Sequence, residues 1–541
     1  MRSPIPVVDV FAGPGGLSEG FASLPDDFHI LVSAEKEAFA HRTLRLRSFR
    51  RLVAREGSSL DSYYRYLNKG NCDPWDDTNR NLWGRACEEA LCLELGKQDD
   101  DALLHSKLEA AKLEGSDWVL VGGPPCQAYS LVGRARNKGK ADYNPDKDER
   151  HRLYQEYLKI IQKFRPSVFV MENVKGILSS TYKGERIFKS ILHDLSDPDR
   201  AVGGDKAGAG YRITSLVHDG VGFTRGCDPD HFDGRAFNVR SEDHGIPQAR
   251  HRVILLGIRE DLPTPDRILE PLQGEMASVA DAISDLPKLR SRISRQADSY
   301  SEWKAIVLSA ASSLSEAAKA RRMTEMAAGL QAVGNSLRSQ PPLDHGALRV
   351  PDSFDLSART ETRAPHLADW VLDDRLDVVL NHEARSHMKS DLARYLYVSV
   401  FGTVWRESPT SHGDFDLPGL KPKHENWSKG HFADRFRVQL EHLPSKTVTS
   451  HISKDGHYYI HPDPTQCRAL TVREAARLQT FPDNYFFEGN RTEQYIQVGN
   501  AVPPLLAKQI AEVVRNLLEK HRHTPASRRE ERSPIFNLTV V

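Results

Sequence analysis

Cysteine is scarce in this chain, and long apolar runs are absent. Of 541 residues only six are cysteine, and no two of the six have CxxC spacing. This pattern argues against a disulfide framework and against a zinc ribbon. No apolar run approaches the roughly 18–20 residues that span a bilayer. The N-terminus passes almost at once into a strand-like run, which leaves no room for a signal peptide, so we expect a protein of the cytoplasm, or of the nucleus in a larger cell.

The chain also lacks an excess of charge of either sign. Lysine and arginine number 74 together, as do aspartate and glutamate. A net charge of zero neither favours nor excludes a nucleic-acid partner, because binding depends on where the basic residues gather. They gather in residues 41–51, which contain five arginines and no acid, and in residues 133–140. The first run is more simply explained as a solvated helix face, whereas the second adjoins a candidate site.

Strand-like and helical segments alternate through the first half of the chain. Helical periodicity is expected at 153–163 and after a glycine loop at 12–21. Short buried strands are expected at 6–11, 30–35, 117–121, 167–171 and 253–258. Strands alternating with helices predict an α/β fold with a doubly wound, mostly parallel sheet.

The glycine loop Gly13-Pro-Gly-Gly16 lies between the first expected strand and a helix. Such a loop presents backbone N–H groups and a helix N-terminus to a ligand. Glu35 ends the next strand, where folds of this kind place an acid that binds ribose hydroxyls. Since the spacing is not the GxGxxG of dinucleotide sites, a nucleoside without pyrophosphate is favoured over NAD.

The loop Gly122-Gly-Pro-Pro-Cys126 presents a single cysteine directly after a strand. A thiol is a good nucleophile only as thiolate, and its usual pKa is roughly 8.5. Backbone dipoles at the end of the strand and the nearby Arg134 and Arg136 favour a lower pKa. A buried structural thiol is the alternative, but it suits the interior of a helix or strand better than a Pro-Pro-Cys turn.

Two further groups of charged residues adjoin expected strands. Glu172 ends one strand, on the edge where open parallel sheets bind ligands. Arg250 and Arg252 alternate with His251 and, if extended, project to one face, where they could clamp a carboxylate, a phosphate or a base carbonyl. His382 and His387 superficially resemble a zinc motif, but five-residue spacing does not place them on one helix face, and no metal is expected.

These motifs stand in a characteristic order. They are Phe11-Ala-Gly-Pro-Gly-Gly16, Gly123-Pro-Pro-Cys-Gln127, Glu172-Asn-Val174, Gln248-Ala-Arg-His-Arg252, Leu470-Thr-Val-Arg-Glu-Ala-Ala-Arg-Leu-Gln479 and Gln497-Val-Gly-Asn-Ala-Val-Pro-Pro504. Together they resemble the successive motifs of the DNA (cytosine-5) methyltransferases. The likeness covers about half of the chain, mainly residues 6–259 and 444–520.

The resemblance implies a Rossmann-like methyltransferase sheet, S-adenosylmethionine as cofactor and a role for each matching residue. The implied catalytic residues are Cys126 as nucleophile, Glu172 as the acid that binds cytosine, and the arginines Arg250 and Arg252. The implied cofactor-binding residues are Phe11, Gly13, Pro14, Gly16, Glu35, Pro124, Asn500 and Ala501. The family's acidic contact to the adenine amino group has no evident counterpart, because a polar segment interrupts the pattern there.

The resemblance also implies how the chain is divided. Residues 1–262 are expected to form the catalytic domain, with an insertion at about 56–115. Residues 263–494 are expected to form a smaller target-recognition domain, and residues 495–541 to return to the catalytic domain. The implied partner is double-stranded DNA, in which a flipped-out cytosine is methylated by a restriction–modification methylase; whether a cognate restriction endonuclease acts alongside, the recognised sequence and the oligomeric state stay open.

Three other functions compete with this interpretation. A tRNA cytosine-5 methyltransferase shares the motifs, but that branch is usually compact after the position of Arg259 and tends to carry a Cys-Phe-Thr motif that this sequence lacks. A non-catalytic DNA-binding relative would have lost the cysteine, the acid or the arginines. A thiol-dependent NAD enzyme would need different glycine spacing.

Overall fold

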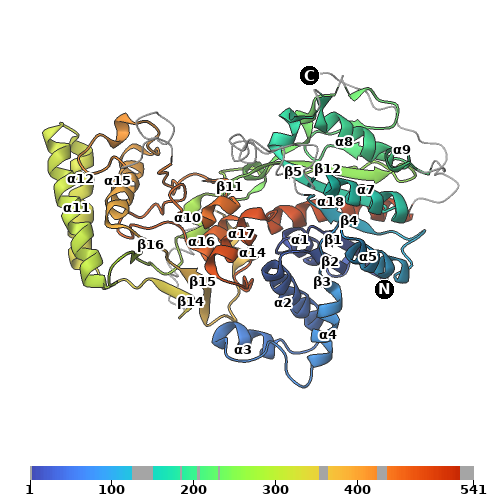
Figure 1. The fold of residues 1–541 in the computed structure, drawn as a ribbon, viewed down its shortest axis with the longest axis horizontal. Helices are drawn as coiled ribbons and strands as arrows, with labels where there is room; N and C mark the ends of the chain where they lie inside the picture. Colours follow the sequence, from blue (N-terminus) through green and yellow to red (C-terminus); the bar gives the residue numbers. More distant parts are fainter. Residues whose placement is uncertain are drawn as a thin grey trace.

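A computed structural model describes residues 3–124, 150–182, 185–203, 208–229, 232–351, 364–422 and 435–523. Figure 1 shows an α/β part built on one large sheet and, beside it, a group of long helices, with α16 (Val472–Leu478) and α17 (Arg491–Asn500) between them. Among the described helices, none has the length and apolar character to cross a membrane. Cys126 and the basic run 133–140 lie outside the described residues.

Over the described residues the central sheet has nine strands, in the order β3-β2-β1-β4-β5-β12-β8-β9, with β10 beside β12. The strands from β3 to β5 are parallel, and β12 runs antiparallel to its neighbours β5, β8 and β10. Their bounds are β1 Ile5–Val10, β2 Phe28–Glu35, β3 Ala90–Cys92, β4 Val119–Gly122, β5 Val168–Val174, β8 Tyr211–Thr214, β9 Gly222–Phe223, β10 Asn238–Arg240 and β12 His251–Arg259. This arrangement confirms the predicted α/β fold with a mostly parallel sheet.

Both faces of the sheet are covered, and successive strand residues pack on opposite faces. Val119 and Val121 belong to one hydrophobic cluster, while Leu120 between them belongs to another. The first cluster includes side chains of α1 (Gly16–Ala22) and α18 (Pro504–His523). The second includes side chains of α5 (Gln98–Ala110), α7 (Arg150–Phe164) and α8 (Ile187–Ser196). Burial on both faces explains why the strands are nearly continuous runs of Val, Ile and Leu.

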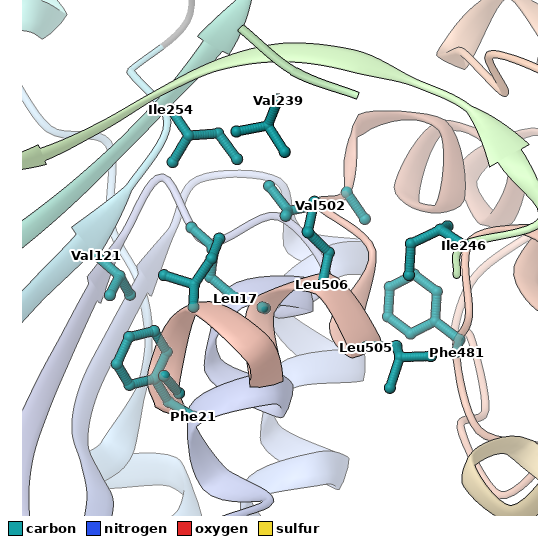
Figure 2. Packing of buried hydrophobic residues seen from close by; sticks show 14 of the residues in the cluster. Leu17, Phe21, Val121, Val239, Ile246, Ile254, Phe481, Val502, Leu505 and Leu506 are labelled. Carbon is teal, nitrogen blue, oxygen red and sulfur yellow. The ribbon is translucent and has the colours of Figure 1, made fainter. Parts of the chain in front are cut away.

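The end of the chain packs directly against its beginning. In Figure 2, Val502 and Leu506 lie toward Leu17 of α1, under the sheet residue Ile254, while Leu505 lies beside Phe481. The approach is so close that a Cβ at Gly16 would lie 2.1 Å from the carbonyl oxygen of Val502. Only glycine leaves room for this contact, which brings the C-terminal motif to the glycine loop.

The segment expected to be an insertion divides into two parts. Its first part contains α3 (Asp61–Lys69) and α4 (Arg80–Glu89), which pack on α2 (Ala38–Arg55) around Phe49, Tyr63 and Leu82. Its second part contains β3, which pairs with β2, and α5, which covers the sheet. Residues 90–110 are therefore part of the sheet and its covering layer, and only the first part is an addition to it.

The basic run 41–51 lies in α2, and part of it is buried. Arg47 forms an ion pair with Glu19 of α1, and Arg51 lies 2.6 Å from a carboxylate oxygen of Glu89. The expectation of a solvated face is therefore wrong for these two arginines, which join α1, α2 and α4.

The second part of the molecule is centred on α11 (Tyr300–Ala320), α12 (Thr324–Ser339) and α15 (Lys389–Trp405), which share one hydrophobic cluster. The hairpin β14 (Gly346–Pro351) and β15 (Val378–Glu383) lies between it and the sheet (Figure 1). The helices α16 (Val472–Leu478) and α17 (Arg491–Asn500) instead contribute to the cluster of the sheet. Residues of the region expected at 263–494 therefore belong to two clusters, that of the sheet and that of the long helices.

Candidate active site at the carboxyl edge of the sheet

Three neighbouring strands end side by side at the edge where the predicted site residues lie. Gly122 at the end of β4 is in register with Val10 of β1 on one side and with Met171 of β5 on the other. Neighbouring strands are about 4.8 Å apart. The glycine loop, the segment leading to Cys126 and Glu172 therefore emerge next to one another.

The glycine loop has an unusual backbone that its hydrogen bonds hold in place. Phe11, Gly13 and Gly15 all have positive φ, of 56°, 57° and 94°. The N–H of Gly13 donates to Oε2 of Glu35 at 2.8 Å, and the N–H of Glu37 donates to Oε1 at 2.8 Å. Burial raises the pKa of Glu35. Both carboxylate oxygens keep lone pairs, and nothing lies within 4 Å of a Cβ built on Gly13, so the loop and Glu35 fit a nucleoside-containing cofactor.

Asp9 is a buried acid behind this loop that sequence reasoning missed. It lies in β1, in register with Ser33 of β2 and Val121 of β4, and is 1% exposed. Burial raises the pKa of Asp9 to about 7. Its place just before Phe11 in a strongly apolar strand is the sequence signal that marks it, since an isolated acid in such a strand is rarely accidental.

Glu172 lies against the segment that leads to the cysteine. An Oε1 atom of Glu172 is 2.7 Å from Nε of Arg252, and only 13% of either side chain is exposed. A Cβ on Gly123 would be 3.0 Å from Oε2 of Glu172. Asn173, which sequence reasoning also passed over, directs its Nδ2 to the carbonyl oxygen of Pro124 at 3.4 Å. The acid, the arginine and the start of the cysteine loop are thus in contact, while Cys126 itself lies outside the described residues.

Arg250 has different surroundings from Arg252. Its side chain is buried, and its Nη1 donates to the carbonyl oxygens of Val448 at 2.8 Å and Gly499 at 3.4 Å. Burial, and then the charge of Arg252, lower the pKa of Arg250 well below its usual value. Arg250 therefore joins the start of β12 to the C-terminal segment.

Asn500 and Ala501 belong to this same segment and directly precede Val502, whose carbonyl oxygen approaches Gly16. A Cβ on Gly499 would lie 2.2 Å from the backbone of Thr449, so the chain there passes close to its neighbour. Gln479 donates to the carbonyl oxygens of Val498 at 2.7 Å and Ala501 at 3.3 Å. Ala501 is buried and Asn500 is exposed at the end of α17.

His382, the first of the two histidines that resemble a zinc motif, has a structural role. His382 is buried, with Nδ1 2.9 Å from the Thr471 hydroxyl and Nε2 2.9 Å from the carbonyl oxygen of Pro287. Burial lowers the pKa of His382 to about 4. Within the described ranges, no group of three or more His, Cys, Asp or Glu side chains could hold a metal ion.

Comparison with known proteins agrees with this geometry. The family model described as C-5 cytosine-specific DNA methylase matches residues 98–199 and 238–516. Type II methyltransferase M.Bpa9945I of Bacillus paralicheniformis is 31% identical over 537 residues, which cover 95% of this chain and 99% of that protein. Type II methyltransferase M.DdeI of Desulfomicrobium norvegicum is 24% identical, over 94% of this chain and 87% of its own. Type II methyltransferase M.AgeI of Thalassovita gelatinovora is 28% identical, over 73% of this chain and 82% of that protein.

Proposed function

The chain belongs to the C-5 cytosine-specific DNA methylase family, and we propose that it transfers a methyl group from S-adenosylmethionine to carbon 5 of a flipped-out cytosine through a transient bond to Cys126. The substrate would be a specific sequence in duplex DNA, modified in the cytoplasm by a restriction–modification methylase, and the likeness to proteins named type II methyltransferases supports this. The target-recognition domain, residues 263–494, would select that sequence.

The observation that carries this proposal is the common edge of β1, β4 and β5. The loop of Gly13 follows the first strand, the segment leading to Cys126 follows the second, and Glu172 ends the third. Methylation at carbon 5 needs a cofactor, a nucleophile and an acid around one ring, and these strand ends supply all three.

Carbon 5 of cytosine is a poor nucleophile, which is why a thiol is required. Attack of the Cys126 thiolate on carbon 6 forms a C–S bond and makes carbon 5 enamine-like. S-adenosylmethionine, when bound, supplies an electrophilic methyl group. Loss of the carbon 5 proton to a base, for which a water molecule is a candidate, then allows the thiolate to leave and restores the aromatic ring.

Glu172 and Arg252 would act on the ring itself. Glu172 hydrogen-bonds N3 and the exocyclic amine, which stabilises charge that develops there during the attack. Arg252 holds this carboxylate, as its 2.7 Å contact supports, and also lies near the O2 carbonyl of the base. Arg250 does not act on the ring directly, because its hydrogen bonds go to the C-terminal segment.

The cofactor would lie along the glycine loop. Glu35 would hold its ribose, Phe11, Gly13, Pro14 and Gly16 would line it, and Pro124 would border the methyl group. Asn500 and Ala501 would close the pocket. The cytosine must leave the duplex to reach this site, at a cost of a few kcal/mol.

The proposal is tested by methyl transfer from labelled S-adenosylmethionine to random-sequence duplex DNA and to tRNA, with bisulfite sequencing of the DNA product. We expect modified cytosines in one duplex sequence, covalent trapping on 5-fluorocytosine DNA, and loss of both with Cys126→Ser. Cys227→Ser is the matched control, because this thiol lies beside Thr224, away from the strand ends. Methylation of tRNA alone, or full activity of the Cys126→Ser protein, would contradict the proposal.

A further inference from the structure

The apex of the glycine loop contacts a residue from the far end of the chain. The hydroxyl of Tyr485 donates a hydrogen bond to the carbonyl oxygen of Pro14, across 471 positions of sequence. A Cβ on Gly15 would lie 3.1 Å from the Tyr485 hydroxyl and 2.7 Å from Cδ2 of Leu44. The loop and the tyrosine thus fit together without spare room.

This contact acts on a stretch of backbone that needs support. Positive φ is costly for a residue with a side chain, and Phe11 adopts it next to the two left-handed glycines of the loop. The N–H of Gly15 donates to Ala12 at 2.9 Å and that of Gly13 donates to Glu35. Pro14 has no N–H, so its carbonyl oxygen is the hydrogen-bonding group by which the apex can be held.

Tyr485 is itself fixed on every side. It is 1% exposed and packs against Phe481 and Phe487, with ring centroids 4.7 Å and 5.4 Å away. The guanidinium of Arg47 lies 4.7 Å from the centre of its ring. Burial, and then the charge of Glu19, raise the pKa of Tyr485, which keeps the hydroxyl a donor.

The residue before Tyr485 connects it to three other parts of the molecule. Nη1 of Arg47 donates to Oδ1 of Asn484 at 2.7 Å, and the hydroxyl of Tyr63 in α3 donates to the Asn484 carbonyl oxygen at 3.0 Å. The side-chain amide of Asn484 donates to Asp373, which lies in the connection between β14 and β15. The added helix α3 therefore has a physical role: through Tyr63 it holds the segment of Asn484 and Tyr485, which in turn contacts the glycine loop at Pro14.

We propose that Tyr485 is a positioning residue for the cofactor, whose hydroxyl fixes the Pro14 carbonyl and keeps the glycine loop in the shape that binds S-adenosylmethionine. The inference rests on the proposed function, in which this loop is the cofactor site. The residue touches neither the reacting cytosine nor the methyl group, so it should affect cofactor affinity and leave the chemical step alone.

The test is Tyr485→Phe, with Tyr495→Phe as a matched control. Tyr495 is also buried, donates to a backbone carbonyl, that of Leu470 at 2.7 Å, and lies under an arginine, Arg385, at 4.1 Å. Calorimetric titration with S-adenosylmethionine should give a dissociation constant about five- to tenfold higher for Tyr485→Phe, as expected for one buried hydrogen bond. Its KM for the cofactor should rise likewise, with kcat at saturation unchanged, and Tyr495→Phe should match the parent in both.

A second variant keeps the test decisive if Tyr485→Phe does not fold. Tyr63→Phe removes the bond to Asn484 and should raise the same dissociation constant by a smaller factor. Equal affinities for Tyr485→Phe and Tyr495→Phe, or a fall in kcat without a change in affinity, would overturn the inference. Failure of the parent protein to bind S-adenosylmethionine would instead overturn the proposed function.

Discussion

Arg250 and Arg252 are two positions apart in the sequence, yet their surroundings give them different tasks. Arg252 contacts the carboxylate of Glu172, whereas Arg250 is buried and donates to backbone carbonyls of the C-terminal segment. Sequence reasoning grouped them as one clamp because their spacing alone does not reveal that the chain turns between β11 (Gln248–Ala249) and β12. Their variants should therefore separate stability from activity.

Arg250→Lys should lower the free energy of unfolding by about 2–4 kcal/mol, because a lysine cannot reproduce the buried guanidinium contacts. Arg252→Lys should leave stability nearly unchanged and lower kcat by about 100-fold, since the planar donor beside the developing charge is lost. Thermal unfolding and initial rates on duplex DNA measure the two effects. The opposite result, with Arg252→Lys unstable and Arg250→Lys stable but inactive, would refute this division of roles.

Asp9 should make stability depend on pH. Its folded pKa of about 7 exceeds its usual value of 3.8, so the folded state binds the proton more tightly than the unfolded state, and stability is lost as pH rises toward the folded pKa. Asp9→Asn cannot titrate. Relative to the parent, the stability of Asp9→Asn should rise by about 2–3 kcal/mol from about pH 5 to about pH 8, at about 1.4 kcal/mol per pH unit below about pH 7 and with little further change above it.

Urea unfolding at several pH values measures this difference. The exposed Asp26 supplies the control, and the curves of Asp26→Asn and the parent should run parallel. If the difference in free energy of unfolding between Asp9→Asn and the parent stays constant with pH, Asp9 does not cause the pH dependence.

Among the elements, α1 depends most on close packing. Gly16→Ala places a methyl group where the Val502 carbonyl lies, 2.1 Å away, and should lower the free energy of unfolding by about 1–3 kcal/mol. It should also weaken cofactor binding, because the glycine loop precedes α1. Gly84→Ala is the control, because Gly84 is exposed in α4 and a Cβ built there has no atom within 4 Å. This variant should be neutral or should raise the free energy of unfolding by about 0.5–1 kcal/mol. Equal losses in the two variants would show that packing is not the cause.

The elements that were predicted from the sequence are those with a strong local signal. The strands β4, β5 and β12 lie close to the expected ranges, because apolar runs bounded by loops mark them. The strand β3 was missed, since three residues between polar helices carry no periodicity and are defined by pairing with β2. The contact between Tyr485 and Pro14 could not be predicted, because nothing local relates residues so far apart.

For the molecule as a whole, a net charge of zero still allows DNA binding that depends strongly on salt. We expect the logarithm of the association constant for duplex DNA to fall linearly with the logarithm of salt concentration. Replacing Lys138 and Lys140 together by alanine should reduce that slope by about 2, if each neutralises one phosphate. Fluorescence anisotropy over a range of salt concentrations measures it.

The helix α2, which contains most of the first basic run, supplies the comparison. Arg42 and Arg55 are exposed residues of α2, in a helix whose buried arginines join it to its neighbours. Their double alanine variant should keep the parental slope. A slope that falls for this variant and not for the lysine variant would assign DNA contact to α2 instead.

The packing of α18 on α1 also sets when a newly made chain can work. The glycine loop is synthesised long before the backbone that covers Gly16, because that backbone comes from Val502. A ribosome must therefore translate as far as Val502 before this contact can form. Products that stop short of it, whether by premature termination or by proteolysis ahead of α17, leave the loop uncovered, so the modifying activity should come only from chains that include this segment.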